Sequence, residues 1–233
     1  VYWSSEGALE APDFLTISGR PHDLEKKSQE IKFNSVVLGP GLGANEKSYQ
    51  QLKKIIELSQ KHEFPVVLDA DGINLIVKYK ISQLPKNWVI TPHAGELSRI
   101  LKISAAEIDF DRVAAVREAI QSLGCLVFLK GFHSLLGVEN KIIIINSGNK
   151  ALAKAGTGDV LSGMIGGFTS QGLSLAKATC LADYVHGYIA DNWVHCGKDY
   201  LSLIASDLLD LIPSSLAKIR ISYAAHSKRA VTN

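Results

Sequence analysis

The chain has 233 residues, of which 46% are hydrophobic and 21% are charged, and its formal net charge is +2. This composition is typical of a globular chain long enough for one large core, and the small net charge argues against a nucleic-acid or membrane-surface partner. No apolar run reaches the length of a membrane span. The three cysteines lack metal-ligand spacing, and an odd number of thiols in apolar surroundings is typical of a reducing compartment, so we expect the cytoplasm.

The first clear strand, residues 36–38, ends in the loop Gly39-Pro40-Gly41-Leu42-Gly43. This loop is either a plain tight turn or backbone left bare for a ligand, since its spacing matches no standard nucleotide fingerprint. An amphipathic helix is predicted from Glu46 to His62. The next strand, residues 65–68, is followed by two acids. Asp69 and Asp71 are candidates for holding Mg²⁺ through waters, and the alternative for Asp71 is a cap on a short helix over residues 73–77.

Two further apolar strands also end in polar, turn-rich segments. Residues 88–91 lead into Pro92 and His93, and a lone histidine in a turn is more often a structural group than a catalyst. Residues 126–129 lead into Lys130, whose side chain either reaches solvent or neutralises an anion. In open α/β sheets, ligands bind at the carboxyl ends of the strands. These weak motifs therefore predict one functional rim.

The most informative stretch follows a strand over residues 142–145 and reads Gly156-Thr157-Gly158-Asp159, with a helix directly after it. A strand, a glycine-rich turn and a helix N-terminus together predict an anion site. Asp159 would repel a bound phosphate but suits the deprotonation of a hydroxyl, and we expect the helix dipole to hold its pKa low. The alternative is a simple helix cap. Each of Gly163, Gly166 and Gly167 costs the helix about 1 kcal/mol, which indicates close packing against another element or a ligand.

Helices are also predicted over residues 109–123, 175–193 and 204–211, and Pro213 is a stop signal for the last of them. Residues 214–233 show no continuing periodicity, so we expect a frayed or disordered tail. Without a repeat or a linker, the economical prediction is a single domain over residues 1–213.

Taken in order, these motifs resemble the ATP/ADP-dependent NAD(P)H-hydrate dehydratases, over about residues 35 to 213. The resemblance is carried by residues 39–43, 68–71, 91–96, 129–134 and 155–163. It implies a ribokinase-like α/β fold, a three-layer αβα arrangement around a mostly parallel sheet. The family begins with another glycine-rich strand–helix unit, which nothing here matches, so we expect that N-terminal unit to be missing.

The resemblance also implies roles for individual residues. Asp159 resembles the catalytic base that contacts the hydroxyl of the substrate, with Gly156, Thr157 and Gly158 as the anion hole. The implied nucleotide-binding residues are those three together with Lys130, Gly131, Phe132, His133 and Ser134, and the implied substrate contacts are Gly41, Gly43, His93 and Asp159. No metal-ligating residue is implied. Phe132 and Ser134 stand where the family often has Ala and Thr, and Lys154 stands where a small residue is usual.

The implied activity is the repair of hydrated NADH and NADPH. ATP or ADP phosphorylates the ring hydroxyl, and elimination of phosphate restores the ring. Mg²⁺ is expected to bridge the nucleotide phosphates, and the implied partners are NAD(P)H hydrate, an adenine nucleotide and an epimerase domain, fused or separate. We also expect a homo-oligomer, and neither a nucleic acid nor a membrane as a partner.

Two alternatives remain open. A vitamin-precursor kinase of the same superfamily, acting on a hydroxymethylpyrimidine or thiazole alcohol, would share Asp159 but lack the combined His93 and Lys130 segments. A catalytically silent nucleotide-binding module is the other, and the presence of Asp159 argues against it.

Overall fold

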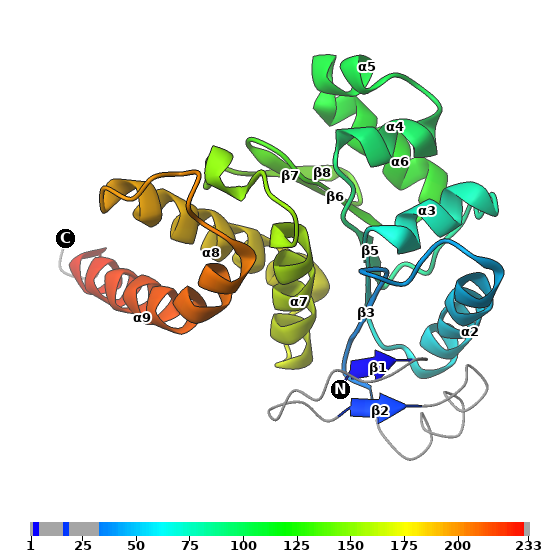
Figure 1. Cartoon of the computed structure of the whole chain (residues 1–233), viewed down its shortest axis with the longest axis horizontal. Coiled ribbons are helices and arrows are strands. Elements are labelled where there is room, and N and C mark those ends of the chain that lie inside the picture. Colours follow the sequence, from blue (N-terminus) through cyan, green and yellow to red (C-terminus); the bar gives the residue numbers. More distant parts are fainter. Residues whose placement is uncertain (1, 5–15, 19–32, 231–233) are drawn as a thin grey trace.

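The computed structural model describes residues 2–4, 16–18 and 33–230, and its centre is a six-stranded sheet in the order β3-β4-β5-β6-β7-β8 (Figure 1). The strands are β3 (Val36–Leu38), β4 (Val66–Leu68), β5 (Trp88–Ile90), β6 (Leu126–Leu129), β7 (Ser134–Val138) and β8 (Lys141–Ile145). The first four are parallel, and β7 and β8 continue the sheet antiparallel. Two short strands, β1 (Tyr2–Ser4) and β2 (Thr16–Ser18), form a separate parallel pair.

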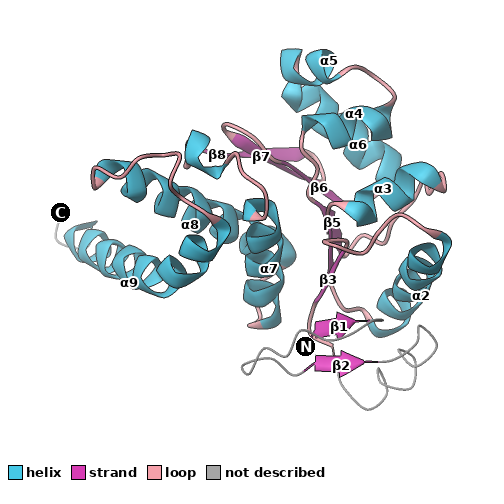
Figure 2. Cartoon of the chain, in the orientation of Figure 1, coloured by secondary structure: helices cyan, strands magenta, loops and turns pink. Residues whose placement is uncertain are grey.

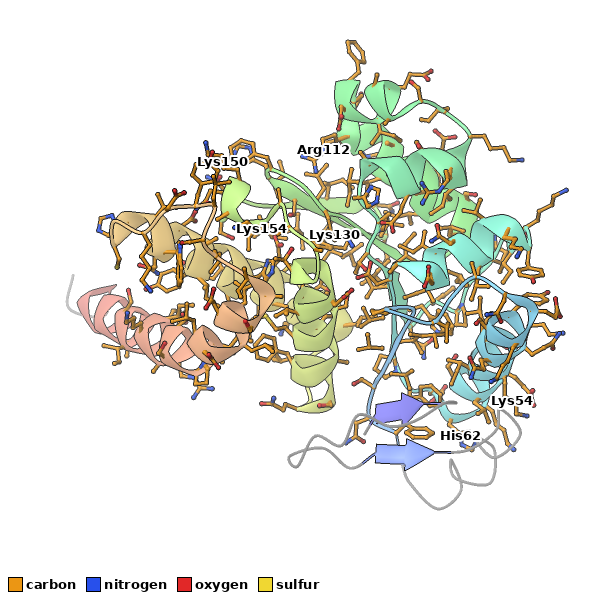
Figure 3. The ribbon with its side chains drawn as sticks, viewed as in Figure 1. Lys54, His62, Arg112, Lys130, Lys150 and Lys154 are labelled. Carbon is orange, nitrogen blue, oxygen red and sulfur yellow. The ribbon has the colours of Figure 1, made fainter. Side chains whose placement is uncertain are left out.

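Helices cover both faces of the six-stranded sheet (Figure 2). One layer holds α2 (Glu46–His62), α3 (Asp71–Lys78), α4 (Ala94–Leu101), α5 (Ala105–Phe110) and α6 (Arg112–Leu123), and the other holds α7 (Thr157–Ser170), α8 (Leu175–His195) and α9 (Ala205–Ala230). Successive strand residues alternate between these layers, so that Val66 and Leu68 join the first core and Val67 joins the second. The expected three-layer αβα architecture with a mostly parallel sheet is confirmed. Side chains are described for residues 33–224 (Figure 3).

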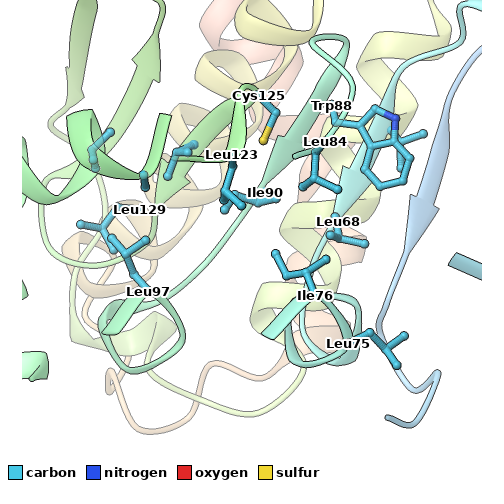
Figure 4. Packing of buried hydrophobic residues seen from close by; sticks show 14 of the residues in the cluster. Leu68, Leu75, Ile76, Leu84, Trp88, Ile90, Leu97, Leu123, Cys125 and Leu129 are labelled. Carbon is cyan, nitrogen blue, oxygen red and sulfur yellow. The ribbon is translucent and has the colours of Figure 1, made fainter. Parts of the chain in front are cut away.

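The core between the sheet and the first helix layer is built around Trp88, which is fully buried on β5 (Figure 4). Its indole Nε1 donates a hydrogen bond of 2.9 Å to Ser59 Oγ on α2, so the polar end of the ring has a partner. Leu68 and Ile90 pack in the same cluster. Full burial of each such aliphatic side chain stabilises the fold by about 1.5–3 kcal/mol.

One edge of the sheet collects the polar loops, as predicted. The parallel strands β3 to β6 all end there, and β8 ends there too, because Ser134 at the start of β7 pairs with Ile145 at the end of β8. Strand β7 itself was not predicted. Its fourth residue is Gly137, where a Cβ would lie 2.3 Å from Ile120 Cδ1 of α6. Close packing of the helix on the sheet therefore requires glycine here, although glycine has a low strand propensity.

Helix α9 continues through Pro213 to Ala230, so the expected helix end at Pro213 and the irregular tail after it are corrected. A proline inside a helix costs about 3 kcal/mol. Packing of Leu216 and Ile219 against the second core opposes that cost. The described residues exclude residues 231–233 and most of the region before β3. The prediction that an N-terminal strand–helix unit is missing concerns that region, so it lies outside the described residues. Among the described helices, none is long and apolar enough to cross a membrane, and the single-domain organisation stays a prediction.

Candidate active site

The start of α7 forms an uncapped helix N-terminus at the rim of the sheet. Gly156 occupies the N-cap position with φ of 82°, a left-handed conformation that favours glycine, and it offers no side chain for capping. The Thr157 hydroxyl turns back and lies 2.7 Å and 2.8 Å from the carbonyl oxygens of Leu152 and Lys154. The N–H groups of Gly158 and Asp159 therefore lack a capping side chain, which is the arrangement that binds anions.

Asp159, the third residue of α7, makes no hydrogen bond or ion pair with any residue that the structure describes, so the alternative of a simple helix cap is not supported. Burial raises the pKa of Asp159, the nearby Asp69 carboxylate raises it further, and Lys130 partly offsets both effects. The expectation that the helix dipole holds this pKa low is therefore wrong. A raised pKa brings the carboxylate closer to the operating pH, where a general base is most effective.

Lys130 lies beside this helix start, between the sheet and α7 (Figure 3). Its Nζ is 2.7 Å from Asp69 Oδ1, and the Ser162 hydroxyl of α7 donates to Asp69 Oδ2 at 2.6 Å. A Cβ on Gly158 would lie 3.5 Å from the same Nζ. Asp69, which is only 1% exposed, thus anchors the Lys130 ammonium next to the proposed anion site.

The two strand-end acids do not form a ready cation site. Both carboxylate oxygens of Asp69 are engaged as described, and Asp71 Oδ2 accepts from Gly43 N at 2.8 Å. Asp71 is also not the cap of α3, since the N-cap is Ala70, which makes no side-chain cap bond. Within the described ranges, no group of three His, Cys, Asp or Glu residues could hold a metal ion. The residues therefore do not fit a Mg²⁺ ion held directly by the protein.

The predicted substrate contacts lie on loops that follow β3 and β5. A Cβ on Gly39 would lie 1.7 Å from the carbonyl oxygen of Asp69, so the loops after β3 and β4 touch through bare backbone, while Gly41 has open space around it. His93 is the N-cap of α4: its Nδ1 accepts from Gly95 N at 3.0 Å, and its side chain is 59% exposed. The structural role of His93 is thus clear, and its role as a substrate contact stays a prediction.

A pocket of about 500 Å³ opens beside the start of α7. It is lined by most of the predicted nucleotide-binding residues, namely Lys130, Gly131, Phe132, Ser134, Thr157 and Gly158. His133 and Gly156 do not line it, and neither do Asp159 or the predicted substrate contacts Gly41, Gly43 and His93. The structure therefore gathers the nucleotide set around one cavity and leaves the substrate set outside it.

Two side chains that were not predicted from the sequence make hydrogen bonds to segments that line this pocket. Arg112, at the start of α6, donates to the carbonyl oxygen of Phe132 and, at 3.1 Å, to that of His133. At another part of the lining, Asp191 of α8 accepts from Gly148 N at 2.8 Å and from Asn149 Nδ2 at 2.9 Å.

Lys154, which had no interpretation from sequence, is bound by backbone carbonyl groups. Its Nζ donates to the carbonyl oxygens of Tyr200 and Leu203 at 2.9 Å and 2.6 Å. The Lys154 ammonium thus links the segment before α7 to the segment before α9. This role explains why a lysine can stand at a position where the family usually has a small residue.

Helix α8 also contributes Asp183 and His186 to the pocket, and sequence reasoning missed both. His186 Nε2 lies 3.0 Å from the carbonyl oxygen of Thr157, and burial lowers its pKa to about 4. Burial raises the pKa of Asp183 to about 7. The sequence did contain a signal for these two residues. Asp183 and His186 are ionisable and lie three positions apart in a largely apolar part of a predicted helix, and ionisable residues are uncommon in buried segments.

Comparisons with known proteins show the family of the chain. The family model described as NAD(P)H-hydrate dehydratase matches residues 11–214. The chain belongs to the NAD(P)H-hydrate dehydratase family. An ADP-dependent (S)-NAD(P)H-hydrate dehydratase from Neisseria meningitidis is 37% identical over 189 residues, and the match covers 76% of this chain and 62% of that protein. A bifunctional NAD(P)H-hydrate repair enzyme from Coxiella burnetii is also 37% identical, with 74% of this chain and 34% of that enzyme covered.

Solved structures extend the comparison to the fold of the family. The ADP/ATP-dependent NAD(P)H-hydrate dehydratase from Bacillus subtilis, co-crystallised with ATP and Mg²⁺, superposes with a TM-score of 0.75 and 27% identity, covering 89% of this chain and 72% of that one. A ribokinase-like superfamily protein from Enterococcus faecalis has a TM-score of 0.77 at 23% identity, with 89% and 70% of the two chains covered, and shows the fold alone. The chain spans 34% and 62% of the length of the two sequence relatives named above.

Proposed function

We propose that the chain catalyses the ATP- or ADP-dependent dehydration of NAD(P)H hydrate to NAD(P)H, a carbon–oxygen lyase reaction. Membership of the family supports this activity. The observation that carries it is the position of Asp159, an unpaired carboxylate in the first turn of an uncapped helix, with Gly158 of the same turn lining the pocket. A hydroxyl that must lose its proton while a phosphoryl group arrives requires both features side by side.

In this proposal, the nucleotide occupies the pocket beside α7. Its phosphates lie at the segment Gly156–Gly158, with the Lys130 ammonium next to them, and Gly131, Phe132, His133 and Ser134 contact the remainder. The hydrate lies on the other side of the helix start, against Gly41, Gly43 and His93. Asp159 then faces the junction between the two ligands.

The reaction proceeds in two balanced stages. Asp159 takes the proton of the ring hydroxyl as that oxygen attacks the terminal phosphorus, and the nucleotide leaves with one phosphate fewer. The lone pair of the ring nitrogen then expels inorganic phosphate by breaking the carbon–oxygen bond, and loss of a proton from the adjacent carbon restores the ring double bond. The protein contributes positioning and stabilisation of charge, as in phosphoryl transfer generally.

Several accompanying features belong to the same proposal. Mg²⁺ would arrive with the nucleotide, bound to its phosphates, and would neutralise part of their charge. An epimerase domain acts with this chain, consistent with relatives named as bifunctional repair enzymes. Cytoplasmic location and a homo-oligomeric state remain predictions.

The test is a turnover assay with the full chain, NADH hydrate, Mg²⁺ and either ATP or ADP. We expect dihydronicotinamide absorbance and inorganic phosphate to appear together in equal amounts. A parallel assay offers a hydroxymethylpyrimidine or thiazole alcohol in place of the hydrate. Phosphorylation of that alcohol without turnover of the hydrate would replace the assignment with a kinase. Nucleotide binding without hydrate-dependent turnover would indicate a silent binding module.

A further inference from the structure

A carboxylate on α8 is buried in the nucleotide pocket without adequate partners. Asp183 lines the pocket and is only 7% exposed. Its Oδ1 lies 3.4 Å from Ser134 Oγ, and its Oδ2 is buried with no hydrogen-bond partner in the described part of the chain. Nearly all buried polar atoms in folded proteins are paired, because an unpaired one destabilises the fold.

Even the contact with Ser134 is weak. A serine hydroxyl has one proton to donate, and Ser134 Oγ lies 3.1 Å from the carbonyl oxygen of Gly131, closer than it lies to Asp183. When the proton goes to Gly131, neither oxygen of the Asp183 carboxylate receives a hydrogen bond from a side chain. The carboxylate is therefore free to accept from a molecule in the pocket.

The surrounding charges decide which kind of group that molecule presents. Lys130 is already paired with Asp69, and Lys150 Nζ sits 3.7 Å from the centre of the Tyr200 ring. A phosphate next to Asp183 would be repelled, and the phosphate site at the start of α7 offers a better place for it. The group that faces Asp183 is thus a hydrogen-bond donor and not a phosphate oxygen.

We infer that Asp183 is a specificity-determining residue of the nucleotide pocket, whose carboxylate accepts a hydrogen bond from the bound nucleoside. The donor is a ribose hydroxyl or the amino group of the base, since both are hydrogen-bond donors. The inference rests on the proposed function, because it takes the occupant of the pocket to be an adenine nucleotide.

The ionisation of Asp183 provides an independent readout. The titratable and charged groups around it are Lys130 from the end of β6, Lys150 from the turn after β8, and Cys180 and His186 on its own helix. Burial raises the pKa of Asp183 to about 7 in the free chain. A ligand that donates to the carboxylate favours its ionised form, so binding should release protons near pH 6 and tighten as the pH rises through 7.

The experiment is calorimetric titration of the full chain with four Mg²⁺-bound nucleotides: ADP, 2′-deoxy-ADP, 3′-deoxy-ADP and inosine diphosphate. Each analogue lacks one candidate donor. We expect ADP to bind roughly 10- to 100-fold more tightly than the one analogue that lacks the true donor. Asp183→Ala should bind that analogue and ADP with equal affinity.

Two further variants test the ionisation of Asp183 and provide a control. Asp183→Asn has the same shape and should fold, yet it should abolish proton release on binding, which is measured by titrating in buffers of different ionisation enthalpy. Thr179→Val is the matched control, because Thr179 is equally buried one turn earlier on α8 and does not line the pocket. It should keep both the ADP preference and the proton release.

Two outcomes would overturn the inference and leave the proposed function standing. One is equal wild-type affinity for all four nucleotides, and the other is an ADP preference that survives in Asp183→Ala. Failure of the wild-type chain to bind any of the four would remove the nucleotide assignment of the pocket itself.

Discussion

Asp159, Glu96 and Glu107 each occupy the third position of a helix, but only Asp159 is left without a capping role. Glu96 accepts from the backbone N–H of His93 at 2.9 Å, and Glu107 accepts from that of Ser104 at 2.8 Å. Asp159 lacks such a bond because its N-cap is Gly156 in a left-handed conformation. The same residue type at the same helix position thus stabilises the fold in one case and remains chemically available in the other.

Replacement of Asp159 by Asn should therefore reduce turnover by roughly 10²- to 10⁴-fold without changing the melting temperature. The carboxylate makes no hydrogen bond with the described part of the chain, and Asn cannot accept the hydroxyl proton. Because the pKa of Asp159 is raised, wild-type kcat/KM should fall on acidification at a pH above the ordinary range of an aspartic acid.

Glu107→Ala is the control for this variant and should behave in the opposite way. It removes the side chain that completes the capping box with Ser104, so the melting temperature should fall while turnover stays at the wild-type level. A turnover of Asp159→Asn within a few-fold of wild type would refute the catalytic role.

The ion pair between Lys130 and Asp69 affects both the stability of the fold and the proposed binding of nucleotide. Replacing Lys130 by Met leaves Asp69 buried with only the Ser162 hydroxyl, which should cost about 3 kcal/mol of unfolding free energy. The double variant Lys130→Met/Asp69→Asn should regain most of that stability but bind ADP as weakly as the single variant. If the double variant also regained the nucleotide affinity, Lys130 would have only a structural role.

At the scale of elements, the glycines of α7 have different surroundings. A Cβ on Gly166 would lie 2.5 Å from Val37 Cγ2 of β3, whereas no described atom lies within 4 Å of a Cβ on Gly163 or Gly167. The expected close packing against another element is thus confirmed for Gly166, and packing against a ligand stays a prediction for Gly163 and Gly167. The Ser35 hydroxyl also donates to the carbonyl oxygen of Gly166 at 2.7 Å, so β3 and α7 meet at this point.

Alanine substitutions should separate these glycines. Gly166→Ala should lower the free energy of unfolding by about 1–3 kcal/mol, because α7 must move away from Val37. Gly163→Ala and Gly167→Ala should each raise it by up to about 1 kcal/mol through helix propensity. Urea unfolding of the three variants measures the contrast, and equal destabilisation by all three would contradict it.

The elements that sequence reasoning predicted well are those whose signal is local. Helix α2 has a clean apolar period, and the parallel strands are short apolar runs followed by polar loops, so the functional rim could be predicted as well. Strand β7 could not, because Gly137 fits the space under Ile120, which only the packed structure reveals. The course of α9 through Pro213 and the pocket role of Asp183 likewise depend on tertiary packing.

At the scale of the whole molecule, two buried groups on α8 influence stability in opposite directions. The pKa of Asp183 is raised to about 7, so its contribution is present below pH 3.8 and is lost as the pH rises through about 7. The pKa of His186 is lowered to about 4, so its contribution is present above pH 6.5 and is lost as the pH falls toward 4. Between about pH 4 and 6.5, the pH dependence of the unfolding free energy that comes from Asp183 nearly cancels that from His186.

Single substitutions should expose each contribution in the ligand-free chain. Relative to wild type, Asp183→Asn should gain unfolding free energy as the pH rises toward about 7, and His186→Gln should lose it as the pH rises toward 6.5. Each slope is at most about 1.4 kcal/mol per pH unit. Urea unfolding at pH 5, 6, 7 and 8 measures them, and parallel curves for all three proteins would show that these groups do not titrate as inferred.

The bonds made by Arg112 and Asp191 have a consequence for how fast nucleotides exchange. Two parts of the pocket lining are fastened by the chain's own hydrogen bonds, one through the carbonyl oxygens of Phe132 and His133 and the other through Gly148 and Asn149. An incoming ligand therefore meets a preorganised cleft and loses little affinity to the ordering of loops. Association should follow a single bimolecular phase, without a slow closing step, and spent nucleotide should leave by the same open route.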